Sequence, residues 1–229
     1  MKSIKLLRAA TDRRGILKGR EVKMEKTFQD IVPNYNDYLD RQNVKYMSHE
    51  RDNPHWEAGQ KRYLLQKFSH CQRDLRILDI SCGDGVGLRV FKDLGFKNVV
   101  GVDYNEDKVK NARLTGYEVF QADMHVLDMF ENSSFDIVYS SHTLEHAYSP
   151  LKVINEFHRI LKPECLLYLV LPFPDTGPDD AHGGKYELKT HQKDPTVVTD
   201  VITAAGFLPI CTETDSFREP EIWITVARL

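Results

Sequence analysis

A glycine-rich turn between an apolar run and a helical pattern constrains this chain more than any other feature. The turn, residues 79–87, reads DISCGDGVG and follows the apolar run 75–78. Glycines permit a positive φ and let a ligand lie directly on the backbone. Twenty residues after Gly83, Asp103 ends a second apolar run, where a carboxylate suits the hydroxyl groups of a ribose. The pattern therefore predicts a nucleotide-type cofactor site.

Beyond this turn, apolar runs alternate with helical patterns, which is typical of a parallel sheet with helices between its strands. The predicted strands are 75–80, 98–102, 117–121, 135–140 and 165–171, and the predicted helices are 85–94, 105–114, 150–161 and 195–205. The last two predicted strands, 207–214 and 221–227, have a connection too short for a parallel crossover, so they must be antiparallel. Aromatic residues before residue 75 indicate an N-terminal helical extension.

With these motifs in order, the chain resembles the class I S-adenosylmethionine-dependent methyltransferases over roughly residues 60–229. The motifs that carry the resemblance are ILDISCGDG (77–85), GVD (101–103), QADM (121–124), FDIV (135–138), TLEH (143–146) and ILKP (160–163). Leu88 stands where a dinucleotide fingerprint needs its third glycine. The resemblance implies an α/β, Rossmann-like, seven-stranded and mostly parallel sheet with an antiparallel last strand, helices on both faces, and S-adenosyl-L-methionine as cofactor.

The resemblance also assigns cofactor contacts position by position. It implies that Asp79 orders the turn and helps to hold the amino group of the methionine part, that Asp103 accepts hydrogen bonds from the ribose, and that Asp123 binds the adenine amino group. The other implied contacts are Ser81, Cys82, Gly83, Gly85, Tyr104, Met124 and Ser140. Helix capping is the alternative for Asp79 and Asp103, and an ordinary turn acid is the alternative for Asp123.

Methyl transfer to a hydroxyl or ammonium group needs a base as well as alignment, and histidine suits that role near neutral pH. We predict His142, after the fourth strand, or His182, in the long loop 172–191, as the catalytic residue. The alternative for each of these two residues is an exposed loop histidine with no catalytic role. His146 has helical spacing to His142, but no third metal ligand is identifiable, and no metal is predicted. The loop acids disfavour a polyanionic acceptor, with a divalent cation held beside His182 as a minority reading.

The predicted function is O- or N-methylation of an unidentified small molecule. The tip of the fourth strand, SSHT at 140–143, lacks the Asn/Asp-Pro-Pro-aromatic motif of DNA and protein amide N-methyltransferases. Three alternatives stay open: a methyltransferase that grips RNA with the basic arm 1–26, a non-catalytic regulator that binds the cofactor, and a nicotinamide-dependent enzyme. The arm carries nine Lys and Arg against three Asp and Glu, which also fits a solvated terminus.

The remaining expectations concern organisation and location. We expect the basic arm and a helical cap over residues 1–60 and the methyltransferase domain over 61–229. The four cysteines are scattered without metal-ligand spacing, which favours a reducing compartment. No apolar run approaches the roughly 20 residues that a membrane-spanning helix needs. We therefore expect a cytoplasmic protein and predict no membrane contact, and the sequence leaves the oligomeric state open.

Overall fold

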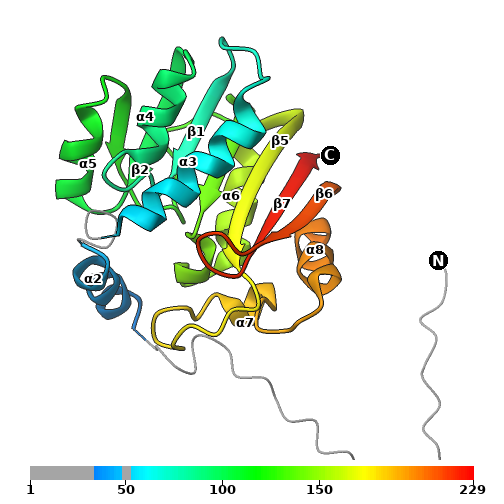
Figure 1. The fold of residues 1–229 in the computed structure, drawn as a ribbon. Coiled ribbons are helices and arrows are strands. Elements are labelled where there is room, and N and C mark those ends of the chain that lie inside the picture. The colour runs from blue at the N-terminus through cyan, green and yellow to red at the C-terminus, as the bar shows by residue number, and fades with distance from the viewer. Residues whose placement is uncertain (1–33, 48–52) are drawn as a thin grey trace, which may run out of the picture.

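A seven-stranded sheet with helices on both faces forms the centre of the molecule (Figure 1). The computed structural model describes residues 34–47 and 53–229. The strands run in the order β3-β2-β1-β4-β5-β7-β6. Their bounds are β1 (Arg76–Ile80), β2 (Asn98–Asp103), β3 (Glu118–Gln121), β4 (Phe135–Ser141), β5 (Leu161–Pro172), β6 (Phe207–Asp215) and β7 (Glu221–Arg228). Strands β1 to β5 pair in parallel, and β7 is antiparallel to both β5 and β6. The predicted fold class is confirmed.

Helices α2, α3, α5 and α8 begin at a residue whose side chain caps the first turn. Asn53 caps α3 by accepting a hydrogen bond from the backbone of Trp56, and Asn105 caps α5 in the same way. Pro54 occupies the first turn of α3, where its missing N–H costs nothing. The helix bounds are α2 (Tyr35–Lys45), α3 (Pro54–Phe68), α4 (Val86–Asp93), α5 (Glu106–Arg113), α6 (Pro150–Ile160), α7 (Lys185–Leu188) and α8 (Pro195–Ala204), with a 3₁₀ turn η1 (Leu144–His146).

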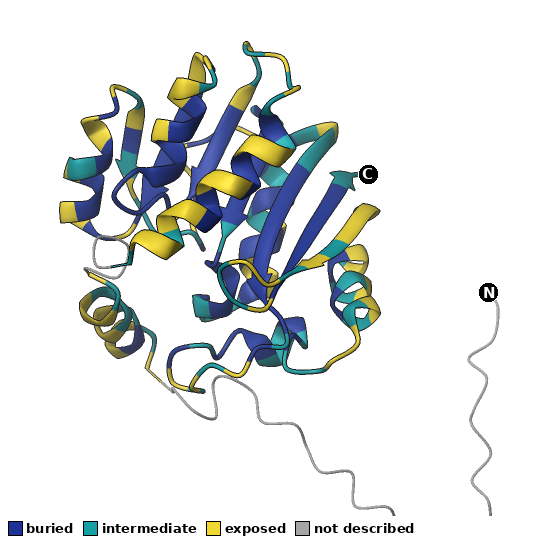
Figure 2. Ribbon diagram, viewed as in Figure 1, coloured by how far each residue is buried: buried dark blue, intermediate teal, exposed yellow. Residues whose placement is uncertain are grey.

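Two apolar cores lie on opposite faces of the sheet, because successive strand residues point to opposite faces. Ile77 packs with Phe68 of α3 and Phe91 of α4 in one core. Its neighbour Leu78 packs with Phe157 of α6 in the other. Figure 2 shows the central strands as almost continuously buried. This burial on both faces explains why the strands read as unbroken apolar runs rather than as alternating patterns.

The N-terminal part meets the sheet through α3. The predicted division at residue 60 lies inside this helix, and Tyr63 and Phe68 beyond it belong to the sheet core. The division stays a prediction, and the basic arm 1–26 lies outside the described residues. Over the parts of the chain that the structure describes, no helix is both long and apolar enough to cross a membrane.

Candidate functional site

A cavity of about 390 Å³ lies where the parallel strands end. Its volume falls within the roughly 300–1,000 Å³ range of small-molecule sites. Strands β1 and β4 are neighbours at the centre of the sheet, where the strand order reverses, and ligands of open α/β sheets bind at such a point. The residues after β1, β2 and β4 that line the cavity are Ser81, Cys82, Asp103, Tyr104, Asn105, Ser141, His142 and Thr143. Helices α2 and α3 close the other side.

The turn after β1 brings its backbone against the cavity. Ser81, Gly83 and Gly85 all have positive φ, at 54°, 56° and 84°. A Cβ on Gly85 would lie 3.0 Å from the Cα of Ala112 in α5, so only glycine fits there without displacement. The Cys82 N–H donates to the carbonyl of Val102 at 3.0 Å, which ties the turn to β2. Ser81 and Cys82 line the cavity, and the cofactor contacts that the resemblance implies for them stay predictions.

Asp103 is the buried carboxylate of this cavity. One of its oxygens accepts the Gly83 N–H at 2.9 Å, and the other accepts the Asn105 N–H at 2.9 Å. Burial raises the pKa of Asp103, while nearby Lys108 and the two backbone donors act in the opposite direction. Each oxygen has a second acceptor position, so the carboxylate is held in place and can still bind two ligand hydroxyls.

Asp79 lies beneath the turn rather than at the cavity wall. It is fully buried, and a Cβ on Gly87 would fall 2.5 Å from its Oδ2. The carboxylate therefore packs against the first turn of α4, where the partial positive charge of a helix N-terminus favours an anion. This position agrees with the expected ordering of the turn. The expected contact with the cofactor stays a prediction.

Asp123 already has protein partners on both carboxylate oxygens. The backbone N–H of His125 donates to Oδ1 at 2.9 Å, with the His125 Nδ1 at 2.7 Å, and the Tyr35 hydroxyl of α2 donates to Oδ2. Burial raises the pKa of Asp123, but the hydrogen bonds from His125 and Tyr35 outweigh it and bring the pKa to about 2. Met124 and Tyr104 line the cavity, whereas Asp123 does not. Its adenine contact stays a prediction.

Ser140 is not at the cavity. It lies inside β4, buried, paired with Ile80 and Leu169 on the two neighbouring strands. Ser141 lines the cavity instead. Adjacent strand residues point to opposite faces of the sheet. A predicted site residue that is one position off along a strand is therefore a buried residue instead of one that faces the cavity. The placement favours Ser141 over the predicted Ser140.

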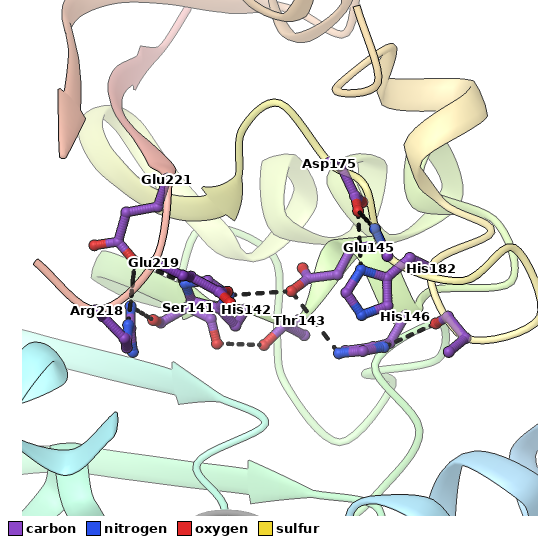
Figure 3. A network of polar contacts seen from close by, with 12 residues as sticks. Ser141, His142, Thr143, Glu145, His146, Asp175, His182, Arg218, Glu219 and Glu221 are labelled. Carbon is purple, nitrogen blue, oxygen red and sulfur yellow. Dashed lines mark hydrogen bonds and ion pairs between the residues drawn. The ribbon is translucent and has the colours of Figure 1, made fainter. Parts of the chain in front are cut away.

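His142 is enclosed by carboxylates (Figure 3). Its Nε2 lies 2.9 Å from Glu221, and its Nδ1 lies 3.1 Å from Glu219 and 3.4 Å from Glu145. Burial lowers the pKa of His142, but the three carboxylates prevail and raise it to about 10. A ring that is protonated at neutral pH cannot take up a further proton. The geometry is therefore at odds with the prediction that His142 is a general base.

His182 has the arrangement of a general base. Its Nδ1 lies 3.0 Å from the buried Asp175, and its Nε2 lies 3.5 Å from the Tyr46 hydroxyl at the cavity. Gly177 makes room for the ring, since a Cβ there would fall 2.2 Å from the His182 Nδ1. Asp175 also accepts the Gly177 N–H at 2.9 Å. The carboxylate thus fixes one ring nitrogen and leaves the other toward the cavity.

His146 and Glu145 sit between these two histidines. The His146 Nδ1 donates to the Ala181 carbonyl at 2.9 Å, so its Nε2 carries no proton. Burial lowers the pKa of His146 to about 4, which keeps the ring neutral. Glu145 is 1% exposed and lines the cavity. Within residues 34–47 and 53–229, no group of three or more His, Cys, Asp or Glu side chains has a metal-binding arrangement.

Sequence reasoning missed the contribution of the terminal hairpin. The connection between β6 and β7 supplies Arg218 and Glu219, and the first residue of β7 is Glu221. All three lie around His142. No motif marks them, because only the pairing of β7 with β5 brings them to the cavity. Trp56 of α3 packs edge-on against His142, with the ring centroids 4.6 Å apart.

Comparisons with known proteins agree with this geometry. Residues 78–169 match a family model described as a methyltransferase domain. A probable S-adenosylmethionine-dependent methyltransferase of Mycolicibacterium smegmatis is 23% identical over 146 residues, which cover 63% of this chain and 56% of that protein. The ubiquinone biosynthesis O-methyltransferase of Pseudomonas aeruginosa is 33% identical over 100 residues, or 41% of this chain and 43% of that protein.

The chain spans about half the length of the curated relatives that it matches. Among solved structures, a SAM-dependent methyltransferase from Aquifex aeolicus superposes with a TM-score of 0.62 at 17% identity. That superposition covers 79% of this chain and 96% of the Aquifex chain, so the two share the fold.

Proposed function

Because this chain carries a class I S-adenosylmethionine-dependent methyltransferase domain, we propose that it transfers a methyl group from S-adenosyl-L-methionine to an oxygen or nitrogen atom of a small molecule. One observation carries the proposal. The buried Asp103 and the His182–Asp175 pair face a single cavity, one on the cofactor side and the other where an acceptor enters. The acceptor is unidentified.

The residues around the cavity fit this cofactor. Asp103 offers two fixed oxygens for ribose hydroxyls, and the turn at Ser81 and Cys82 presents backbone with little side chain. Tyr104 and Met124 supply apolar surface for an adenine. When bound, S-adenosyl-L-methionine supplies an activated methyl group on a positively charged sulfur, and the buried carboxylates of this cavity favour that charge.

In this mechanism His182 removes the proton of the acceptor. Asp175 accepts the hydrogen bond from Nδ1, which leaves the lone pair on Nε2 toward the cavity. As Nε2 gains the proton, the Asp175 carboxylate stabilises the imidazolium, because a buried opposite charge lies 3.0 Å away. His142 stays protonated and contributes positive charge among the glutamates. Tyr46 and Trp56 line the cavity beside these two histidines.

A direct test uses purified protein, labelled S-adenosylmethionine and a panel of hydroxyl and amine acceptors. We expect S-adenosylhomocysteine to bind measurably by calorimetry and NAD not to bind. Saturation by NAD with no heat from S-adenosylhomocysteine would reject the proposal. With a methylated acceptor in hand, His182→Gln should lower kcat by about 10²–10⁴-fold, the usual contribution of a general base.

The His182→Gln variant has its own controls. Its affinity for S-adenosylhomocysteine should stay unchanged, because His182 lies on the acceptor side. His70→Gln, an exchange at an exposed histidine, should behave as the parent. Full activity of His182→Gln would show that the general base is a different residue.

Two further parts of the proposal concern partners and location. We place the protein in the cytoplasm, and the absence of a disulfide among its four cysteines, all of them in the described residues, supports this, since oxidising compartments favour disulfides. RNA as the acceptor depends on the basic arm 1–26, and phosphate contacts weaken steeply as salt rises. We expect no salt-sensitive RNA binding that is lost on deletion of the arm. Such binding would make RNA the preferred acceptor.

A further inference from the structure

Two buried charged side chains at the acceptor end of the cavity have atoms that no described residue satisfies. The first is Arg218, whose side chain is 2% exposed. Its Nε and Nη2 donate to Oε2 of Glu221 at 3.1 and 2.9 Å, but its Nη1 has no hydrogen-bond partner among residues 34–47 and 53–229. Leaving a buried charged donor unpaired is costly, so this atom calls for an acceptor group from a ligand.

The protein holds this guanidinium in one orientation. The stem of Arg218 crosses α3 at Gly59, where a Cβ would lie 2.9 Å from the Arg218 Cβ. The Trp56 ring covers the guanidinium plane at 4.4 Å from its centroid. Glu221, which binds one edge of the fork, is itself fixed by the Trp223 indole N–H at 2.6 Å. The free edge with Nη1 is therefore positioned in advance, as for recognition of a planar anion.

The second side chain is Glu145, on η1, which is 1% exposed and lines the same cavity. Its Oε2 has no hydrogen-bond partner within the described part of the chain, and its Oε1 has only a long contact with the His142 ring. His142 Nδ1 is 3.4 Å from its Oε1, and the unprotonated Nε2 of His146 is 3.8 Å away and donates nothing. Burial raises the pKa of Glu145, but the hydrogen bond from protonated His142 and its positive charge reverse this and lower it. The ionised carboxylate thus calls for a hydrogen-bond donor from a ligand.

These two groups flank a single imidazole. Arg218 and His142 share Oε2 of Glu221, and the other ring nitrogen of His142 faces Glu145. Figure 3 shows His142 between them. The acceptor end therefore presents a cationic donor on one side and an anionic acceptor on the other.

We propose that the methyl acceptor is a small carboxylic acid that also carries an amino or hydroxyl group, with Arg218 bound to its carboxylate and Glu145 bound to its amino or hydroxyl group. The inference rests on the proposed function and specifies the substrate class for the same site. A molecule with only one of the two groups would leave either Nη1 of Arg218 or Oε2 of Glu145 without a hydrogen-bond partner.

The test measures binding of a matched set of compounds to protein saturated with S-adenosylhomocysteine. L-phenylalanine and phenyllactate carry both groups, 3-phenylpropionate carries only the acid, and phenethylamine carries only the amine. Glycine and glycolate extend the set to small frames. We expect at least one bifunctional acid to bind about 10-fold or more tightly than its monofunctional analogues, since a charge-assisted hydrogen bond contributes at least this factor.

Variants then assign each group to its residue. Arg218→Lys should weaken binding of the bifunctional acids and of 3-phenylpropionate about 10-fold and leave the binding of phenethylamine unchanged. Lysine keeps the positive charge but lacks the planar guanidinium with its several N–H donors. Glu145→Gln should weaken phenethylamine and the bifunctional acids and leave 3-phenylpropionate unchanged. Arg62→Lys and Glu213→Gln are matched exchanges outside the cavity and should not change the binding of any compound. Unchanged S-adenosylhomocysteine affinity shows that each variant is folded.

The outcomes separate the two proposals. If S-adenosylhomocysteine binds and no bifunctional acid binds better than its analogues, the acceptor class is wrong and methyl transfer still stands. Equal losses for all compounds in Arg218→Lys or Glu145→Gln would also overturn it, since a merely structural role has that signature. If S-adenosylhomocysteine itself does not bind the parent protein, the proposed function fails.

Discussion

Asp103 combines two tasks that a single carboxylate can perform together. Its two oxygens accept the backbone N–H groups of Gly83 and Asn105, and it still faces the cavity. The first bond fixes the turn after β1, and the second fixes the start of α5. With the ribose contact that we propose for Asp103, one carboxylate orders two loops of the site and binds the cofactor, which couples cofactor affinity to local order.

We expect Asp103→Ala to weaken binding of S-adenosylhomocysteine by about 1–3 kcal/mol, because charge-assisted hydrogen bonds to the ribose are lost. Isothermal titration calorimetry measures the change. Asp93→Ala, at the exposed end of α4, serves as the control and should bind as the parent does. Equal affinity in Asp103→Ala and the parent protein would remove Asp103 from the cofactor site.

The proton on His142 makes stability depend on pH in a direction that can be tested. The folded pKa is about 10, above the value of about 6.5 for an unfolded histidine. The folded state therefore binds the proton more tightly. The resulting stabilisation is complete below about pH 6.5 and is lost as the pH rises through about 10.

The comparison of the parent with His142→Gln isolates this effect. We expect the parent to be the more stable protein at low pH, with a difference in unfolding free energy that shrinks between about pH 6.5 and 10. Urea unfolding at a series of pH values measures it. A difference that grows with pH would mean that His142 is neutral when folded and would restore it as a candidate base.

At the scale of elements, α2 spans both ends of the site. Tyr35 at its start donates to Asp123, and Tyr46, next to its end, faces His182. Between them, Asn43 accepts a hydrogen bond from Asn105. The helix buries only Tyr38 of its own residues, so polar contacts to the rest of the site hold it in place more than apolar packing does. A helix held in this way opens at low free-energy cost.

We expect the backbone amides of α2 to exchange with deuterium faster than those of α4 in the free protein. S-adenosylhomocysteine should slow exchange in α2, because Leu39, Asn43 and Tyr46 line the cavity. Hydrogen exchange followed by mass spectrometry measures both rates. Exchange in α2 that does not respond to the ligand would show that the helix does not close over the cofactor.

At the scale of the whole molecule, the sheet divides the interior into two cores that must form together. Phe91 of α4 belongs to one core and Phe157 of α6 to the other, and both are fully buried. The strands are shared, because alternate residues of each strand enter the two cores. Loss of packing on one face therefore removes support from the other.

We expect Phe91→Ala and Phe157→Ala each to lower the free energy of unfolding by about 3–5 kcal/mol. Unfolding should remain a single transition by fluorescence and by circular dichroism, since both probes report one cooperative unit. An exposed apolar residue, Leu114, gives the control, and Leu114→Ala should change stability little. Two separated transitions would mean that the two faces fold independently.

Local patterns determined the elements of this protein and part of its site. Apolar runs, caps and the short terminal connection are local, so they predict strands, helices and the antiparallel hairpin with bounds close to those observed. The turn around Gly83 and Gly85 also follows from the sequence, because positive φ selects for glycine. The place of Asp103 was also predictable, since its spacing from the turn is set by one helix and one strand.

Only the tertiary structure decided which side chains meet at the acceptor end. Arg218 and Glu221 come to His142 from the far end of the chain, through pairing of β7 with β5. These neighbours also decide the protonation of His142, because a histidine among three glutamates keeps its proton. Sequence separation carries no information about such neighbours, and a pKa depends on the charges within a few ångströms rather than on the residue type alone.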